Sequence, residues 1–216
     1  MTLLTPAQRR ERNRQEMIDG ILQVSRDIMR DKGAAALNLN EVARRVGVKT
    51  PSLYSYFPNK MAIYDAVFRK GMEMFAEAIT IPEGISGWDC FQYVFEAYMS
   101  FAVENPELYQ ILFERPVPGF VPSEESMAFS IASLNRGREE MAEIIAEIGI
   151  DPGVPIEQAM DLTIALSHGI TAQHMANEPH LPVGEGRYGS LIPQAVALFK
   201  SAWGRNLSDN EVDGAN

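Results

Sequence analysis

Hydrophobic positions along this chain recur at spacings of three and four residues, which is the period of an amphipathic helix. One such run occupies residues 17–29, and others follow in 39–46, 50–57, 60–75, 91–102, 106–113, 127–148, 156–177 and 190–203. We find no strand-like alternation, no internal repeat and no low-complexity tract. The sequence therefore predicts an all-α fold.

Residues that favour helix ends lie at the borders of these runs. Thr5-Pro6 with Gln8, Asn38 with Glu41, Thr50-Pro51 and Asn59 mark starts, and Gly33 marks an end. Residues 38–57 then read as helix, short turn, helix, which is the helix-turn-helix pattern. Gly47 suits a turn that needs positive φ, and Leu53 and Phe57 are expected to face inward.

The stretch LNEVARRVGVKTPSLYSYFPNK, residues 39–60, resembles the helix-turn-helix of the TetR family of transcriptional regulators. The carboxy-terminal part resembles that family only in its helical layout. The resemblance implies a DNA-binding domain of three helices followed by a helical domain that binds an effector and forms a homodimer, in a protein that acts as a repressor. Two residues depart from the family pattern: Lys49 replaces a small hydroxyl residue, and Tyr56 replaces a histidine.

Charge is distributed unevenly along the chain. Residues 1–70 hold 13 Lys and Arg against 7 Asp and Glu, a net of +6, whereas residues 71–216 hold 6 against 22, a net of −16. A basic end on an acidic body is typical of a nucleic-acid-binding module joined to another domain. Two solvated surfaces of opposite sign would give the same counts.

The second helix of the pair is expected to present its first residues to base edges in the major groove. Hydroxyls serve either base type and lysine reaches guanine, while tyrosine hydroxyls and a lysine at a helix start reach phosphates. The predicted DNA-binding residues are Asn38, Lys49, Thr50, Pro51, Ser52, Tyr54, Ser55, Tyr56 and Lys60. The alternatives are a solvated Lys49 and a Tyr54 that only packs. Arg9, Arg10, Arg12 and Arg14 read as an arm on the DNA backbone or minor groove, or as a solvated segment.

In the acidic half, small residues line one face of the 156–177 helix and apolar residues cover a wide face of the 190–203 helix. Two such helices from each of two chains would form a four-helix interface, which suits a palindromic DNA site. The predicted interface residues are Ala165, Gly169, Ala172, Ala176, Leu191, Ala195, Leu198 and Ala202. The alternative is that both helices pack within one chain.

The middle helices are rich in aromatic residues and methionine, the composition of an apolar ligand pocket and also of an ordinary core. With the family resemblance, the predicted effector-binding residues are Phe75, Phe95, Tyr98, Met99, Phe113, Met141, Ile164 and His168. His168 is the candidate polar anchor for a small, largely apolar effector.

Other classes are less favoured by the sequence. His168 and His174 lie roughly 120° apart around a straight helix and cannot share one metal ion, and we expect no metal, no cofactor and no enzyme activity. A small helical enzyme that uses His168 with Asp161 or Glu178, or a protein-interaction module, are the alternatives. One cysteine and no apolar run of roughly 18 residues favour a cytoplasmic protein. The expected domains are 1–70 and 71–204, with a polar tail, 205–216, expected to be disordered.

Overall fold

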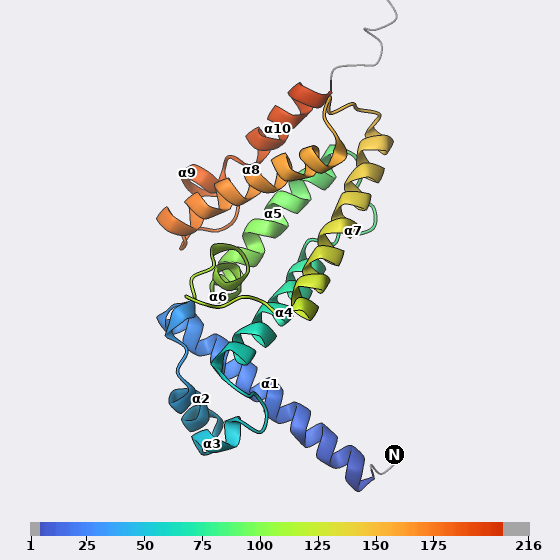
Figure 1. Cartoon of the computed structure of the whole chain (residues 1–216). Coiled ribbons are helices and arrows are strands. Elements are labelled where there is room, and N and C mark those ends of the chain that lie inside the picture. The colour runs from blue at the N-terminus through green and yellow to red at the C-terminus, as the bar shows by residue number, and fades with distance from the viewer. Residues whose placement is uncertain (1–4, 205–216) are drawn as a thin grey trace, which may run out of the picture. The chain divides into compact units, whose positions relative to one another are not determined.

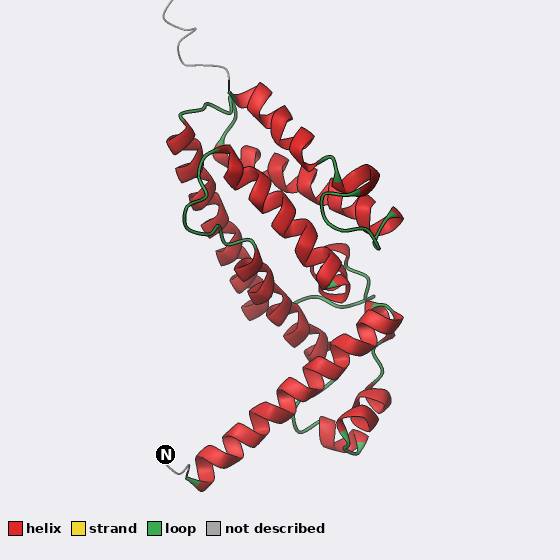
Figure 2. Ribbon diagram, turned by 180° about the vertical axis from the view of Figure 1, so that it is seen from behind, coloured by secondary structure: helices red, strands yellow, loops and turns green. Residues whose placement is uncertain are grey.

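The computed structural model describes residues 5–204, and these residues form helices and loops without any strand (Figures 1 and 2). The all-α prediction is confirmed. The predicted tail, 205–216, lies outside the described residues. The helices in chain order are α1 (Pro6–Lys32), η1 (Ala34–Ala36), α2 (Leu39–Val46), α3 (Thr50–Leu53), α4 (Lys60–Ala78), α5 (Trp88–Glu104), α6 (Pro106–Tyr109), η2 (Gln110–Glu114), α7 (Glu124–Ile148), α8 (Ile156–Asn177), α9 (Gly186–Gly189) and α10 (Ile192–Trp203).

The described chain divides into two compact units. The first comprises the residues up to Met72 together with Asn105–Met127, and the second comprises Glu73–Glu104 with the residues from Ala128 onward. The predicted domains 1–70 and 71–204 stay a prediction. What no local pattern indicated is that Asn105–Met127 packs with the amino-terminal unit.

The helix-turn-helix of the first unit forms where the capping residues indicate. A reciprocal capping box between Thr5 and Gln8 starts α1. Asn38 caps α2, and Asn59 accepts a hydrogen bond of 3.0 Å from the Ala62 N–H in the first turn of α4. Gly47 ends α2 in the left-handed conformation, with φ 85° and ψ 26°, and its N–H donates to the Ala43 carbonyl. Only glycine adopts this conformation without steric cost.

The second helix of the pair is shorter than predicted. We expected it to reach Phe57, but the α-helix ends at Leu53 and residues 54–56 form a turn. The turn is closed by N–H groups of Tyr56 and Phe57, which both donate to the Leu53 carbonyl at 2.9 Å. Pro58 prevents the helix from resuming after this turn, because the residue before a proline, here Phe57, disfavours the helical conformation. Leu53 and Phe57 are buried, as predicted.

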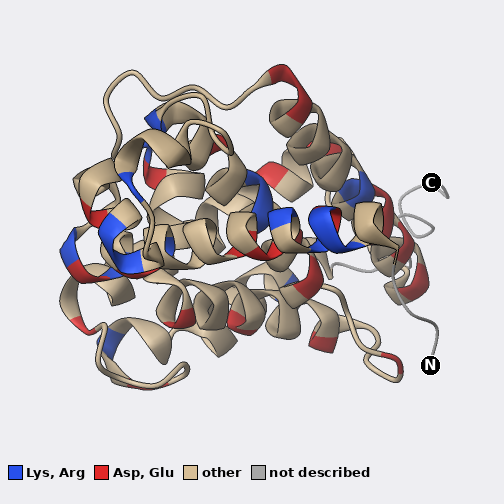
Figure 3. Ribbon diagram, turned by 90° about the horizontal axis from the view of Figure 1, so that it is seen from below, with Lys and Arg blue, Asp and Glu red and all other residues tan. Residues whose placement is uncertain are grey.

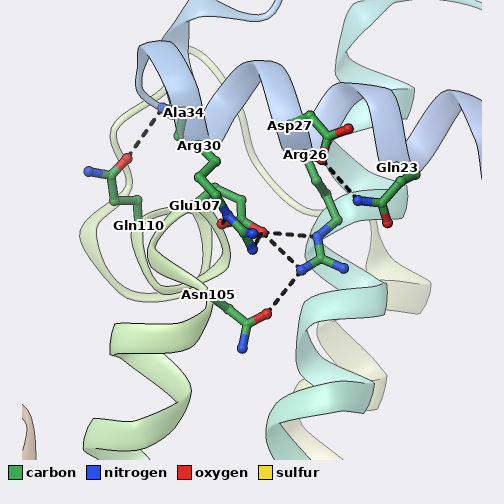
Figure 4. Close-up of polar contacts among 8 residues, drawn as sticks. All are labelled: Gln23, Arg26, Asp27, Arg30, Ala34, Asn105, Glu107 and Gln110. Atoms are coloured by element: carbon green, nitrogen blue, oxygen red, sulfur yellow. Dashed lines mark hydrogen bonds and ion pairs between the residues drawn. The ribbon is translucent and has the colours of Figure 1, made fainter. Parts of the chain in front are cut away.

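A buried carboxylate fixes α6 against α1 in the first unit (Figure 4). The Glu107 side chain is fully buried and accepts hydrogen bonds from Arg26 and Arg30, both on α1, at 2.9–3.0 Å. Arg26 also donates to the Asn105 side chain at 3.0 Å. The hydrogen bond to Glu107 raises the pKa of the Arg30 guanidinium, so this cation stays charged. The Glu107 carboxylate, shared by two guanidinium groups, therefore joins α6 to residues of α1 that lie 77–81 positions earlier in the chain.

Further polar contacts hold the same segment in the first unit. The Ala34 N–H donates to the Gln110 side chain at 3.2 Å (Figure 4). The Tyr64 hydroxyl donates to the Ala34 carbonyl at 2.9 Å. Near the start of α7, the Asp65 carboxylate accepts from the N–H and hydroxyl of Ser123 at 2.7 and 2.8 Å. Polar contacts thus hold α1, the part of α4 up to Met72 and the 105–127 segment together in the first unit.

The second unit is built around an aromatic and aliphatic core. Helices α5, α8 and α10 contribute most of it, and α7 adds Met141 and Ile145. The rings of Phe91, Phe199 and Trp203 lie 4.4–6.1 Å apart, centroid to centroid, in tilted or edge-on arrangements. Aromatic pairs at these separations stabilise a core beyond the area that they bury.

The loop predicted at 178–189 contains a short helix, α9, that the sequence did not indicate. The Glu178 carboxylate accepts hydrogen bonds from the backbone N–H groups of Arg187 and Tyr188, at 2.8 and 3.3 Å. A side-chain cap eight or more residues away in sequence replaces the local capping signal. This is why the Gly- and Pro-rich composition read only as loop.

We predict that Glu107→Ala destabilises the first unit by about 3 kcal/mol, because it leaves two arginines without their shared carboxylate. This value is the low end of the range for a buried pair, since the Arg30 side chain is 45% exposed. Urea unfolding followed by circular dichroism measures the change. Glu114→Ala, which removes an exposed carboxylate from the same segment, serves as the control. Equal midpoints for the two variants would contradict the role of Glu107.

Candidate nucleic-acid interface

The predicted DNA-binding residues lie just before α2, on and just before α3, in the turn that follows α3, and at the start of α4. Lys49, Pro51, Ser52 and Ser55 are exposed, and Tyr54 is 53% exposed. Thr50, Tyr56 and Lys60 are half-buried. The structure therefore brings these side chains to one end of the first unit with polar groups free to meet a ligand. Their role in DNA binding stays a prediction.

Internal hydrogen bonds fix the orientation of two of these hydroxyls. The Thr50 hydroxyl donates to the Asn40 side chain at 2.9 Å, which joins the start of α3 to α2. The Ser55 hydroxyl donates to the Ser52 carbonyl at 2.7 Å. Sequence reasoning missed Asn40. The signal available was a polar residue at the second position of α2, facing the helix that follows the turn.

The arginines before the first buried position form part of a helix rather than an extended arm. α1 begins at Pro6, and Arg12 pairs with Glu16 one turn later at 3.3 Å. Arg14 reaches the reading end: it donates to the Ser55 carbonyl at 3.2 Å and lies 5.4 Å from the Tyr56 ring centroid. The guanidinium over the ring is a cation–π contact, so Arg14 supports the turn after α3.

Asn38 has a structural task that the sequence also indicated. Its side-chain oxygen accepts from the N–H groups of Asn40 and Glu41 at 2.9 and 3.2 Å, which caps α2. The capping oxygen is thus occupied, and only the amide N–H₂ remains for a contact with DNA. Lys60 starts α4, and its ammonium lies 5.5 Å from the Tyr64 ring centroid.

Two cations at this end are free of protein carboxylates. Arg44 and Lys49 are exposed, and neither forms an ion pair with any residue in 5–204. By contrast, Glu41 pairs with Lys32 at 2.7 Å and with Arg45 at 2.6 Å, and the hydrogen bond from Lys32, followed by that from Arg45, lowers the pKa of Glu41. Figure 3 marks the charged residues on the ribbon. The sequence analysis did not single out Arg44, although its charge on α2 was visible.

On α8 and α10, most of the predicted interface residues are accessible within this chain. Ala165, Gly169, Ala176 and Ala202 are exposed, Leu191 and Leu198 are 40% and 64% exposed, and Ala172 is half-buried. The prediction that Ala195 is an interface residue needs correction. Ala195 is only 2% exposed, because it lies on the same side of α10 as Ile192, Val196 and Phe199 and packs in the core.

The predicted effector-binding residues divide between the interior of the second unit and other places. Phe95, Met99 and Met141 belong to the core cluster, and Phe75 packs edge-on against Tyr98 with centroids 5.4 Å apart. The Tyr98 hydroxyl lies 2.9 Å from His168 Nδ1. Two predictions need correction. Phe113 belongs to the first unit, where its ring packs on Tyr109, and Ile164 is 38% exposed rather than interior.

These contacts bear on the enzyme alternative. Glu178 is engaged with the backbone at the start of α9, and His168 is hydrogen-bonded to a tyrosine. His174 is buried, with Nε2 3.2 Å from the Leu181 carbonyl. Within residues 5–204, no group of three or more His, Cys, Asp or Glu side chains is placed to hold a metal ion. In the same part of the chain, every helix is too short or too polar to span a bilayer.

The fold and this end of the molecule define a helix-turn-helix protein with a separate helical second unit. Residues 21–67 match the family model of bacterial regulatory proteins, tetR family. The chain thus carries the amino-terminal domain of the TetR family, as its sequence predicted.

Comparisons with individual proteins agree on the fold. The chain is 22% identical over 96 residues to the TetC protein of transposon Tn10 from Escherichia coli, which covers 44% of this chain and 49% of that protein. The chain spans about half the length of the curated relatives it matches. A TetR family regulator from Chloroflexus aurantiacus superposes with a TM-score of 0.63 at 17% identity, covering 88% and 94% of the two chains. FadR from Bacillus subtilis, solved with stearoyl-CoA, gives 0.65 at 17% identity, covering 85% and 98%.

We predict that Asn38→Ala destabilises the first unit by about 1 kcal/mol, because α2 loses its amino-terminal cap. Asn38→Asp keeps a capping oxygen and should unfold at nearly the wild-type urea concentration. The pair separates capping from any contact made by the amide N–H₂. A wild-type midpoint for Asn38→Ala would show that the cap contributes nothing.

Proposed function

We propose that this chain is a dimeric one-component transcriptional regulator, a cytoplasmic repressor that binds a palindromic operator and is released by a small, largely apolar effector. The observation that carries the proposal is the exposed start of α3, with Lys49, Pro51 and Ser52. On α2, the exposed Arg44 forms no ion pair with any residue in 5–204. A helix that follows a tight turn and presents short polar side chains and cations suits the major groove. Repression rather than activation is an expectation from the family.

Charge supports contact through residues 1–70. Residues 1–70 carry a net of +6 and the rest of the chain −16, so the acidic part is repelled by DNA phosphates. Tyr54, which is 53% exposed, and Lys60, at the start of α4, are the proposed phosphate contacts. Ser52 and Thr50 are the candidates for base contacts.

Selection of fragments from bacterial genomic DNA at physiological salt, followed by sequencing, tests operator binding. A recovered palindrome with half-sites about one helical turn apart is the expected result. Absence of any enriched sequence with folded protein, with or without added effector candidates, contradicts the proposal. Binding to a protein partner without salt dependence would instead favour an interaction module.

We predict that Lys60→Ala weakens binding to all DNA sequences alike, because phosphate contacts carry no sequence information. The log–log salt slope should become shallower by about 0.9, the value for one phosphate contact. Fluorescence anisotropy on specific and random duplexes measures both quantities. Arg136→Ala, which removes an exposed cation from the second unit, is the control and should leave binding unchanged. A changed sequence preference would place Lys60 at a base edge instead.

The dimer is proposed to form through the exposed sides of α8 and α10. Small side chains at Ala165, Gly169 and Ala176 allow another helix to approach, and no atom lies within 4 Å of a Cβ built on Gly169. Leu198 supplies apolar area that is 64% exposed in the single chain. A two-fold axis through such helices would repeat the reading end once per half-site.

We predict that Leu198→Asp gives monomers in light scattering, because the interface would then bury an unpaired charge. Val121→Asp is the matched control, since Val121 is 79% exposed on a loop of the first unit. Trp203 is unsuitable for this test, because it is only 4% exposed and packs in the core. An intact dimer in the Leu198 variant would place the interface elsewhere.

The effector is proposed to bind in the second unit, with Phe75, Phe95, Met99 and Met141 against its apolar part. Tyr98 and His168, joined by their 2.9 Å hydrogen bond, are the proposed polar anchor. Because FadR from Bacillus subtilis was solved with stearoyl-CoA, that compound is a reasonable first probe of operator release. Release requires that the ligand bind the DNA-incompetent state more tightly than the DNA-bound state.

A further inference from the structure

Three polar side-chain atoms of the second unit are buried without a hydrogen-bond partner among the described residues. They are Ser133 Oγ, Arg138 Nε and His174 Nδ1. His174 has a partner inside the protein, because its Nε2 donates to the Leu181 carbonyl. Its Nδ1 faces the backbone of Gly189, where a built Cβ would lie 3.3 Å away. The remaining two atoms both belong to α7.

Ser133 and Arg138 lie at the two margins of the inward face of α7. At 100° per residue, the angle between them is about 140°. From Ser130 to the end of α7, the helix positions within that arc are half-buried or buried. A Cβ built on Gly137, inside the arc, would lie 3.1 Å from the Met160 side chain of α8. Met141, one turn further, belongs to the apolar core. Arg138 therefore lies where an apolar interior meets solvent.

The guanidinium of Arg138 is held by the protein but not neutralised by it. Arg138 is half-buried, and its Nη1 donates to the Asn135 side chain at 3.2 Å. Its Nε is buried and has no hydrogen-bond partner among the described residues. No carboxylate in residues 5–204 forms an ion pair with it. A buried charged donor without an acceptor is costly, and the guanidinium fork matches a carboxylate or phosphate with two parallel hydrogen bonds.

The rest of the unit restricts which anion can bind there. Residues 73–104 and 128–204 hold 15 Asp and Glu against 4 Lys and Arg, and the other three cations, Arg136, Arg187 and Lys200, are exposed. A small inorganic anion is repelled by this excess of negative charge and gains nothing from the neighbouring apolar face. An anion that also buries a hydrocarbon body gains both the ion pair and the apolar contact.

We propose that Arg138 binds the acidic head group, a carboxylate or a phosphate, of an amphipathic effector whose apolar body lies along the Met141 side of α7. This inference rests on the proposed function, because it assigns a chemical class to the effector of the second unit. It adds a residue that the aromatic and methionine pattern did not include. It also narrows the effector from a largely apolar molecule to an anionic amphiphile.

Titration of the full-length protein with dodecanoate, dodecyl phosphate and dodecan-1-ol tests the assignment. Calorimetry and the fluorescence of the two tryptophans, Trp88 and Trp203, report binding. We expect the two anions to bind at least about tenfold more tightly than the alcohol, the lower value for a hydrogen bond to a charged group. A preference between the anions identifies the head group, and either preference agrees with the proposal.

The variant Arg138→Met keeps an unbranched apolar stem and removes the charge. It should weaken binding of the preferred anion by about tenfold to a hundredfold while the affinity for the alcohol stays the same. Arg136→Met makes the same change at an exposed position two residues earlier and should alter neither. Thermal melting by circular dichroism checks that both variants are folded.

Three results overturn the proposal: equal binding of anion and alcohol by the wild type, wild-type anion affinity in Arg138→Met, or no binding of any of the three compounds by folded wild type. Operator binding is measured on the same preparations without ligand. Retained operator binding with any of these results removes only the anionic effector. Absent operator binding with anion-selective, Arg138-dependent binding removes the proposed regulator and leaves the site.

Discussion

The arrangement of the first unit depends on the ion pairs that the buried Glu107 carboxylate forms with Arg26 and Arg30. A carboxylate without water is stable in a protein only when opposite charges and hydrogen bonds replace its hydration. Arg26 and Arg30 supply both, and they stand four residues apart on α1, so one face of that helix presents two guanidinium groups to a single acid. Replacing either arginine by an apolar residue would leave the buried carboxylate with one guanidinium in place of two.

This constraint has a topological consequence. Chain residues 105–127 pack with the amino-terminal unit, yet the chain on both sides, 73–104 and 128–204, belongs to the other unit. The peptide bonds at residues 104 and 127 therefore join α6 and its neighbours directly to helices of the second unit. A ligand that displaces α5 or α7 must act on a segment that is also held by the Glu107 ion pairs with α1 and by the polar contacts of Gln110 and Ser123. The proposed release mechanism needs two states with different ligand affinity, and this covalent continuity offers a route between them.

The local features of the fold were predictable because each depends on residues within a short stretch of sequence. Capping residues such as Thr5, Asn38 and Asn59 mark helix starts through bonds to the next turn, and Gly47 marks a turn by its own backbone freedom. The features that escaped prediction are those whose partners lie far away in sequence. Glu178 starts α9 from eight or more residues before it, and Glu107 reads as an ordinary charged residue until α1 is seen beside it.

The candidate sites divide in the same way, into those that a short stretch of sequence contains and those that depend on tertiary packing. The reading end was predictable because one continuous stretch, residues 38–60, contains it. In the second unit, a pattern of aromatic residues and methionine cannot distinguish a core from a ligand site, since both bury apolar area. Ala195 and Phe113 show the limit, because their helix positions favoured roles that tertiary packing assigned differently.

Buried polar atoms without a partner distinguish a ligand site from a hydrophobic core more clearly than apolar composition does. Folding pairs nearly every buried donor and acceptor, and an unpaired one costs free energy that packing must offset. In an acidic unit, the least costly partner for the buried Nε of the half-buried Arg138 would be one of the unit's own carboxylates, yet none in residues 5–204 forms an ion pair with it. The absence of that pairing, more than the apolar residues around it, is what indicates an acceptor from outside the chain.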